Sequence, residues 1–446
     1  MLQRKLILEG KISKVIVKMA IPSVIMQLVM LIYNTADTYF VSQINKSAAA
    51  AVGTVFSIQS IIQAVGFGFG MGASSLCSRK LGEAKDDDAN RYAVSAIFGA
   101  VVIAAAIGVF GLLLLNPILR GIGCTDTMLP HARAYSMVIL TFAPVSCASF
   151  VIGNIFKAEG HMKMSMYGFV SGTLINLIMD PVFIFILGLG TFGAALSTVL
   201  SQVISICMYS YFFIKGKTVI ELKLRNISRS LDAYYQIVTT GIPTFFRQGL
   251  GSLSMMLLCN QGANYGDAAV AAVTISNKCY MLIRNVVLGI GQGAQPVAGY
   301  NYGAGKYRRA KKSYDFAMLL GTIICLVSSV IIFIFAKDIM WWFCKDNEVL
   351  IYGVPALKYA SMVIPVMAVS TYVNQEYQCL GFKKQATFLA SCRQGICFVP
   401  TIFILPYLLG ATGVEMAQPV SDFLTFIISI PFYFSMAKKL SKDIDN

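Results

Sequence analysis

Long apolar runs recur along the chain, and each is long enough to cross a bilayer as a helix, which takes about 20 residues. The short alternating segments of a membrane β-barrel do not dominate anywhere. The pattern predicts an all-α integral membrane protein with twelve transmembrane helices. We expect these spans at residues 15–41, 52–77, 93–115, 134–156, 165–187, 193–214, 235–262, 269–296, 314–336, 355–379, 388–409 and 413–436.

A repeat relates the two halves of the chain. When the halves are aligned so that Pro22 falls on Pro243, Gly160 falls on Gly381 without a gap, and we call this alignment the repeat register. Further glycines and prolines match in the same order, which chance matching of apolar segments would not produce. The repeated unit holds six spans, and because six is even, both copies run through the membrane in the same direction.

The longest polar break lies between the two copies, from Lys215 to Asp232. We therefore expect two pseudo-symmetric six-helix bundles joined by a cytoplasmic loop. The N-terminal bundle would occupy residues 1–214, the linker loop residues 215–234 and the C-terminal bundle residues 235–446.

Composition and charge support a membrane protein with cytoplasmic termini. Hydrophobic residues make up 57% of the 446 and charged residues only 13%, against about 25% charged residues in soluble domains. With the N-terminus inside, 27 of the 36 Lys and Arg fall on inner segments, 6 on outer loops and 3 in spans, with Arg393 counted in an inner loop. This bias follows the positive-inside rule. It explains the net charge of +15 by topology, so we expect no nucleic-acid partner.

Two carboxylates stand inside predicted spans of the first half. Asp37 lies near the end of the first span and Asp180 in the fifth, where a charge costs about 2.5 kcal/mol or more. Asn176 precedes Asp180 by four residues, so both share one helix face. With hydroxyls from Tyr33 and Thr198, these oxygens suit a monovalent cation such as Na⁺. They equally suit a proton, because two neighbouring acids cannot both ionise easily.

The second half carries no acid at the matching positions. Asp37 falls on Leu258, and Asp180 falls near Pro400. We therefore expect the first half to carry the ion chemistry, with no counterpart of the two acids in the second. His131 and His161 lack metal-ligand spacing, so no metal site is expected beyond a possible Na⁺ at the two acids.

Other polar positions in the spans are candidates for a substrate cavity. Each taken alone is also compatible with helix packing, and an arginine in a span can reach the membrane surface along its own stem. The candidates are Tyr33, Asn34, Tyr135, Asn154, Gln202 and Arg247.

An enzymatic alternative comes from the run Asp86-Asp87-Asp88, which is similar to the acidic cluster of a membrane-embedded prenyl transferase. A magnesium site of that kind needs a second acidic cluster on an inner loop, and none follows. We therefore expect a solvated helix start here, and no enzyme.

Several motifs together resemble the multidrug and toxic compound extrusion (MATE) family, most closely its DinF-like and MepA-like bacterial branch. The resemblance covers essentially the whole chain. Its motifs are MAIP, NTADTYFV with Asp37, GFGFGMGASSLCSRKLGE, FKAEG and NLIMDP in the first half, and GIP, GIGQGAQPVAGYNYGAGK and QCLGFKK in the second.

The resemblance implies a V-shaped pair of bundles that works by alternating access. Such a protein would be an antiporter of the bacterial cytoplasmic membrane, exporting drugs and organic cations in exchange for H⁺ or Na⁺ and contributing to antibiotic resistance. It would need no cofactor, would contact amphipathic substrates and membrane lipids, and would act as a monomer. A flippase for lipid-linked or other amphipathic substrates, which shares this superfamily architecture, stays open as an alternative.

The family's pattern also assigns residues. Asp37, Asn176, Asp180 and Thr198 would form the cation site, and Tyr33 and Tyr135 would line the cavity. The first span would bend near Pro22, as a hinge, when the acids change state.

Overall fold

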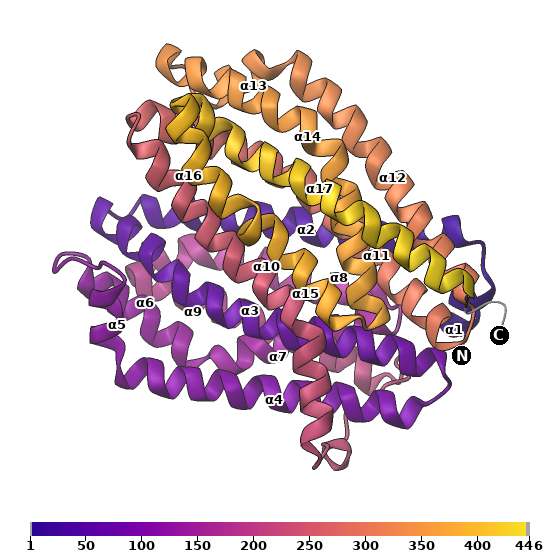
Figure 1. Cartoon of the computed structure of the whole chain (residues 1–446). Coiled ribbons are helices and arrows are strands. Elements are labelled where there is room, and N and C mark those ends of the chain that lie inside the picture. The colour runs from indigo at the N-terminus through magenta and orange to yellow at the C-terminus, as the bar shows by residue number, and fades with distance from the viewer. Residues whose placement is uncertain (1, 443–446) are drawn as a thin grey trace. The chain divides into compact units, whose positions relative to one another are not determined.

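The computed structural model describes residues 2–442 (Figure 1). These residues form helices joined by short loops, and no strand occurs among them. The first half contains α1 (Leu2–Glu9), α2 (Ile12–Ser42), α3 (Lys46–Gly82), α4 (Asp86–Leu113), α5 (Leu115–Gly121), α6 (Leu129–Thr141), α7 (Ala143–Ala158), α8 (Met162–Pro181), a π-helical segment (Val182–Ile186), α9 (Gly190–Ile214) and a 3₁₀ turn (Leu224–Asn226). The second half contains α10 (Leu231–Ala263), α11 (Asp267–Gly303), α12 (Tyr307–Ile334), α13 (Ala336–Phe343), α14 (Asn347–Leu380), α15 (Lys383–Ser391), a π-helical segment (Cys392–Ile396), α16 (Phe398–Leu409) and α17 (Ala411–Lys442).

Each of the twelve predicted spans falls on helix, which confirms the all-α membrane fold. The fourth span is made of α6 and α7, which meet at a bend of 54°. The fifth is α8 continued by its π-helical segment, and the eleventh joins α15 to α16 through the other π-helical segment. Proline and π-helical turns are common causes of such irregular spans.

Nine helices within the described residues are long and apolar enough to cross a membrane, and the bent pair α6 and α7 makes a tenth. The remaining predicted spans, α10 and α11, are less apolar because they carry side chains such as Arg247, Asn277 and Arg284. Polar side chains inside a bundle mark the places where function is concentrated in membrane proteins.

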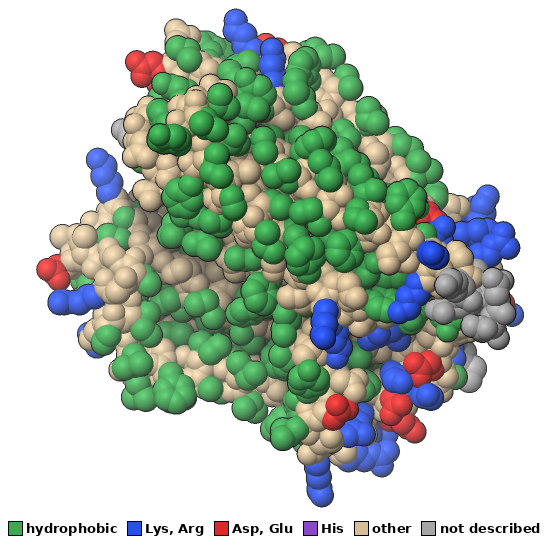
Figure 2. Space-filling view, in the orientation of Figure 1, with side chains coloured by type: hydrophobic (Ala, Val, Ile, Leu, Met, Phe, Trp, Pro, Cys, Tyr) green, Lys and Arg blue, Asp and Glu red, His purple; other side chains and the backbone are tan. Residues whose placement is uncertain are grey.

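Large apolar side chains cover much of the visible surface, and Lys and Arg gather toward its margins (Figure 2). Phe110, Leu113 and Leu408 are examples of side chains that are more than 60% exposed. A surface of this kind in water would favour association. It suits contact with lipid tails, so the chain is a multi-pass membrane protein.

The chain divides into two compact units, and two helices, α2 and α10, each contribute one part to each unit. The first unit holds the residues up to Leu8 together with Ile25–Phe245, and the second holds Glu9–Val24 together with the residues from Phe246 onward. Helix α2 therefore changes unit after Val24, and α10 changes unit after Phe245. The repeat register pairs Val24 with Phe245, so the two helices change unit at equivalent positions. The sequence did not predict this exchange.

Close helix contacts within each unit depend on glycine. In the first unit a Cβ on Gly241 of α10 would lie 2.1 Å from the carbonyl oxygen of Gly68 on α3. In the second unit a Cβ on Gly289 of α11 would lie 2.7 Å from Cα of Val24 on α2. Small residues let helix backbones approach in this way inside membranes. Gly68 and Gly289 are themselves paired in the repeat register.

Candidate functional site

A fully buried polar cluster joins α8 to α9 in the first unit. Asn176 and Asp180 lie one turn apart on α8, and the amide nitrogen of Asn176 donates to Oδ1 of Asp180 at 3.4 Å. The same amide donates to the hydroxyl of Ser197 at 3.2 Å, and that hydroxyl donates to Oδ1 of Asp180. The side-chain amide of Asn176 can also be turned by 180°, which exchanges its nitrogen and oxygen. In that orientation the nitrogen donates to Oδ2 of Asp180 and the oxygen accepts from the Thr198 N–H, both at 3.2 Å. Asp180 has an amide and a hydroxyl partner in either orientation.

A hydroxyl pair connects this cluster to α2. The Tyr33 hydroxyl lies 3.3 Å from Oγ1 of Thr198, the residue next to Ser197 on α9. Thr198 also donates to the carbonyl of Ala194 in its own helix at 3.1 Å, which leaves its oxygen free to accept from Tyr33. Three of the helices that carry predicted site residues therefore meet at this point.

Asp37 lies one turn beyond Tyr33 on α2, so the two side chains share a helix face. The Asp37 side chain is half-buried, and its Oδ1 is shielded from solvent with no hydrogen-bond partner in residues 2–442. The charge of Asp180 acts on that of Asp37, but no hydrogen bond joins them within the same residues. An unpaired carboxylate oxygen in such surroundings requires a proton or a cation to offset its desolvation.

A small cavity of about 40 Å³ adjoins the cluster, and Tyr33, Gln59, Thr198 and Gln202 are among its lining residues. Gln59, which the sequence did not single out, accepts a hydrogen bond from the buried Tyr135 hydroxyl at 3.0 Å. Drug-sized ligands need pockets of a few hundred Å³ or more. In this conformation the cavity holds water-sized ligands, and a larger ligand would require the first unit to open.

The remaining predicted residues lie elsewhere. Asn154 lines a neighbouring cavity with Lys157, and its amide donates to the Phe150 carbonyl of its own helix at 2.8 Å. Asn34 is half-buried on α2 and does not line either cavity. Arg247 belongs to the second unit. The structure thus brings together Tyr33, Asp37, Asn176, Asp180, Thr198, Tyr135 and Gln202, and leaves Asn34, Asn154 and Arg247 outside that group.

Pro22 is buried within α2, which continues as one helix from Ile12 to Ser42. It stands two residues before Val24, the last residue of α2 in the second unit. Proline removes one backbone hydrogen bond from the helix interior and weakens it locally. The predicted hinge therefore lies almost at the point where α2 passes from one unit to the other.

The MatE family model matches this chain twice, at residues 22–182 and at residues 243–404. The chain belongs to the MatE family. The two matches begin at Pro22 and Pro243, which the repeat register pairs, and this confirms the internal repeat. Membership of this family makes the protein a transporter and not an enzyme.

Relatives of known name resemble the chain along nearly its whole length. The multidrug export protein MepA of Staphylococcus aureus (strain MSSA476) is 24% identical over 437 residues, 98% of this chain and 96% of MepA. The MepA protein of Staphylococcus haemolyticus (strain JCSC1435) gives the same values. A crystal structure of MATE in the straight conformation has a TM-score of 0.92 at 25% identity and covers 99% of both chains. The bent conformation gives 0.91, covering 99% of this chain and 98% of that one.

The acidic run of the enzymatic alternative has a structural role in this MatE protein. Asp86, Asp87 and Asp88 form the first turn of α4. Acidic side chains are favourable there because the helix N-terminus carries partial positive charge. No group of three or more His, Cys, Asp and Glu among the described residues is arranged to hold a metal ion.

The second half of this MatE protein holds a buried acid that the sequence did not single out. Asp422 on α17 is fully buried and accepts a hydrogen bond from Nε of Arg393 at 2.7 Å. Arg393 had been assigned to an inner loop, but it lies in the π-helical segment within the eleventh span. The sequence did not predict this ion pair because the two residues belong to different spans and Arg393 stands near the N-terminal end of its own predicted span. Asp422 does not occupy a position that matches Asp37 or Asp180, so those two acids are still not duplicated.

Proposed function

We propose that this MatE protein exports drugs and organic cations across the cytoplasmic membrane in exchange for H⁺ or Na⁺. Its similarity to MepA, which is named as a multidrug export protein, supports drug export. The single observation that supports ion coupling is the buried Asp37 oxygen without a partner among the described residues, in the electrostatic field of a second carboxylate, Asp180, that is held by Asn176 and Ser197. Such an arrangement leaves one negative charge to be neutralised by a bound cation.

The proposed cation site consists of Asp37, Asn176, Asp180 and Thr198, and we add Ser197 because its hydroxyl donates to Oδ1 of Asp180. Their oxygens are carboxylate, amide and hydroxyl groups, which are hard ligands of the kind that Na⁺ accepts. A proton on Asp37 would equally offset its desolvation. The experiment below therefore tests H⁺ and Na⁺ separately as coupling ions.

The substrate path is proposed to run beside this site, along Tyr33, Tyr135 and Gln202. Asn34, Asn154 and Arg247 would join its lining in a more open conformation. Alternating access requires a conformational change that ion and drug bias in opposite directions, and only different affinities for the two states can couple them. Bending of α2 at Pro22 is the proposed change, because this proline stands near the transfer of α2 between units.

The proposed orientation places both termini and the loop at residues 215–234 in the cytoplasm, as the distribution of Lys and Arg indicates. The protein is proposed to function as a monomer in contact with membrane lipids. Attachment of a membrane-impermeant cysteine reagent to a cysteine introduced in that loop, in intact cells, would contradict this orientation.

The deciding experiment is efflux of a fluorescent cationic dye, ethidium, from vesicles containing the purified protein. A pH gradient and a sodium gradient are imposed separately at matched membrane potential. Dye export that is driven by only one of the two gradients, and that is lost in the Asp37→Asn variant, would support antiport and identify the coupling ion. The matched control is Asp126→Asn, which removes an acid that is exposed in an outer loop. Efflux that neither gradient drives would overturn the proposal.

A further inference from the structure

Helix α13 stands where a membrane span ends. It follows α12 with one residue between them, and its eight residues are too few to cross a membrane. The last turns of α12 carry exposed apolar side chains, as at Ile331 and Ile334. Exposed charged side chains begin directly afterwards, at Lys337 and Asp338. This change from apolar to charged surface locates α13 at the level where the hydrocarbon of the bilayer ends.

A cation on the neighbouring helix marks the same level. The ammonium group of Lys358 on α14 lies 5.4 Å from the centre of the Phe333 ring, which belongs to the last turn of α12. Lysine side chains in spans extend along apolar surface so that their charge reaches the membrane interface. The contact therefore indicates that the last turn of α12 lies close to the lipid headgroups.

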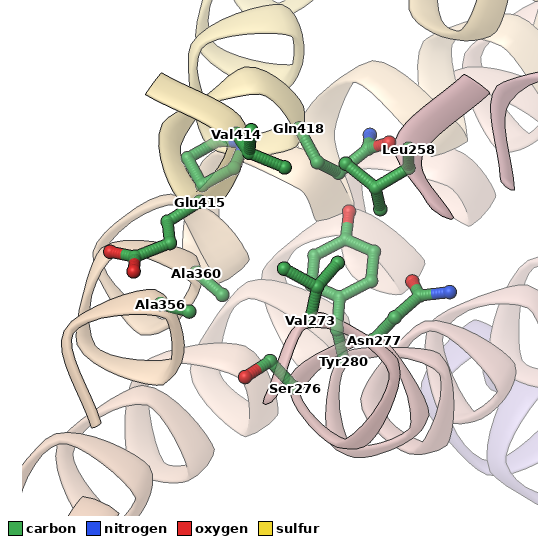
Figure 3. Close-up of a pocket in the computed structure, with 11 residues that line it drawn as sticks. Leu258, Val273, Ser276, Asn277, Tyr280, Ala356, Ala360, Val414, Glu415 and Gln418 are labelled. Atoms are coloured by element: carbon green, nitrogen blue, oxygen red, sulfur yellow. The ribbon is translucent and has the colours of Figure 1, made fainter. Parts of the chain in front are cut away.

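One face of α13 is fixed against the second unit. Met340 is fully buried, and a Cβ on Gly353 of α14 would overlap its side chain. Glycine at this position lets Met340 pack closely against α14. Gly353 lies three residues before Ala356, which lines a small pocket of about 40 Å³ together with Val273 (Figure 3). The buried face of α13 thus has its packing partners within the protein, and its other faces are open to the surroundings.

The open faces of α13 differ in character. Lys337 and Trp341 are four residues apart and share one face. Ile339 and Trp342 are three residues apart and share another, which is apolar. Trp342 is 81% exposed, and its ring meets the Phe343 ring edge to face, with 5.2 Å between the ring centres. The helix therefore presents a charged face and an aromatic face side by side.

The corresponding helix of the first unit carries no aromatic residue. This helix is α5 (Leu115–Gly121), and the repeat register pairs Trp341 with Arg120 and Trp342 with Gly121. Both tryptophans of the chain lie on α13. Formation of the helix does not require them, because α5 forms with an arginine and a glycine at the same places. The exposure of two large rings therefore needs an explanation outside the helix itself.

Tryptophan is enriched at membrane interfaces, because its ring is mostly apolar while its N–H can bond to polar groups of the lipid. Short amphipathic helices with such residues lie in the plane of the interface. We propose that α13 anchors the second unit in the headgroup region of the bilayer, with Trp342 and Ile339 toward the acyl chains and Lys337 toward water. Nine spans precede α13, so the partner is the lipid interface opposite to the N-terminus. The anchor does not depend on the proposed antiport.

Fluorescence gives a direct test, because the tryptophan emission of the whole protein comes from α13 alone. Trp341→Phe leaves Trp342 as the sole tryptophan in protein reconstituted into phosphatidylcholine vesicles. The quenching labels are bromine atoms on the acyl chains, placed either near the ester groups or near the bilayer centre. We expect the shallow label to quench Trp342 at least twofold more than the deep label.

A tryptophan in the middle of α12 supplies the reference for depth. Ile323→Trp is made in a protein that also carries Trp341→Phe and Trp342→Phe. Ile323 is exposed and lies about 16 Å before Ile334 at 1.5 Å per residue, which is roughly half of the hydrocarbon thickness. Its emission should show the opposite order, with stronger quenching by the deep label.

Iodide on both sides of the vesicles tests the orientation of the two faces. Trp342→Phe leaves Trp341, which shares its face with Lys337, and iodide should quench Trp341 at least twofold more than Trp342. Equal quenching of the two residues by iodide would refute the assigned orientation.

Three results for Trp342 would overturn the anchor. Strong quenching by iodide with none by either lipid label would place α13 in water. Stronger quenching by the deep label than by the shallow one would place the ring within the hydrocarbon. Quenching by none of the three would show that protein covers the ring, as in a contact between two copies of the chain.

Discussion

The hydroxyl oxygens of Tyr33 and Thr198 lie 3.3 Å apart, although 165 residues separate them in the chain. This contact connects α2 to α9, and the neighbouring residue on α9, Ser197, donates to Asp180. A change in the position of α2 will therefore alter the surroundings of both acids. The geometry would connect the proposed ion binding at these acids to movement of α2 within the first unit.

Tyr33→Phe should uncouple that route while keeping the ring in place. A single hydrogen bond contributes about 0.5–1.5 kcal/mol net, so we expect gradient-driven dye efflux to fall about two- to tenfold. Tyr39→Phe is the matched control, because Tyr39 lies on the same helix with an exposed side chain. Vesicle efflux rates report the effect, and equal rates for the two variants would remove the Tyr33 hydroxyl from the mechanism.

Asp37→Asn and Asp180→Asn should each reduce ion-driven efflux at least tenfold, because each removes a charge that the coupling ion neutralises. Protein levels should stay near wild type, since loss of a charge at membrane depth lowers a desolvation cost. Dye accumulation in cells is measured together with the amount of protein in the membrane. Normal efflux by both variants would take the acids out of transport, and loss of both proteins would indicate a purely structural role.

Ser197→Ala tests the cluster residue that the sequence did not predict. It removes a donor from Asp180 and one hydroxyl oxygen from the proposed site, so efflux should fall at least threefold. If Na⁺ is the coupling ion, the sodium concentration for half-maximal efflux should rise by a similar factor. Ser136→Ala is the control, because the buried Ser136 hydroxyl has no partner among the described residues. A Ser197 variant that behaves like the Ser136 variant contradicts the assignment.

How far the sequence could predict this cluster depends on helix periodicity. Asn176 and Asp180 are four residues apart, so a shared face followed directly from the helix repeat. Ser197 and Thr198 are adjacent, and consecutive residues point about 100° apart, so the sequence alone could not tell which hydroxyl faces the acid. In the structure Ser197 faces Asp180 and Thr198 faces Tyr33.

The fold was more predictable than the second-half ion pair. Apolar length determines a span, so twelve helical spans could be recognised one at a time. Pairing Arg393 with Asp422 requires knowing that the eleventh span contains a π-helical segment and lies against α17. The transfer of α2 and α10 between units likewise depends on contacts between distant segments, which leave no pattern within either helix.

Gly241→Ala should destabilise the first unit. A Cβ at this position would lie 2.1 Å from the Gly68 carbonyl oxygen, so α10 and α3 would have to move apart. We expect a fall of several degrees in the thermal unfolding midpoint of the purified protein. Gly249→Ala is the control. Gly249 lies on the same helix, but a Cβ added there meets nothing within 4 Å, so this substitution should be neutral or slightly stabilising. Equal midpoints for the two variants would show that the close contact is absent.

Glu159, which follows the last residue of α7, should make stability depend on pH. Its Oε1 accepts from the Ile220 N–H at 2.6 Å, and burial raises the pKa of its carboxyl to about 8. Burial also lowers the pKa of His161, whose Nε2 lies 3.7 Å from Oε2, so this imidazole does not supply a full positive charge to Glu159 at neutral pH. In the unfolded chain the Glu159 carboxyl has an ordinary pKa of about 4.3, so it loses its proton at lower pH than in the folded protein. The stabilisation is therefore complete below the unfolded pKa and is lost as the pH rises toward 8.

Glu159→Gln keeps an acceptor for the Ile220 N–H and does not titrate. Between pH 5 and pH 8 the unfolding midpoint of wild-type protein should fall by several degrees more than that of this variant. Glu221→Gln, in the exposed part of the neighbouring loop, should keep the wild-type slope. Parallel pH profiles for wild type and Glu159→Gln would exclude a buried carboxyl that gains its proton on folding.

The transfer of α2 after Val24 and of α10 after Phe245 bears on how the protein is synthesised. The first unit cannot be complete when the ribosome reaches the linker loop, because it still lacks the first half of α10. Residues Glu9–Val24 leave the ribosome early, but their packing partners in the second unit are made only after Phe245. A fragment that ends within residues 215–234 would therefore lack part of its own unit and carry an unpaired helix half of the other. The complementary fragment, which begins at that break, would lack the matching parts. The two fragments, encoded as separate chains, should be stable only when both are made in the same cell.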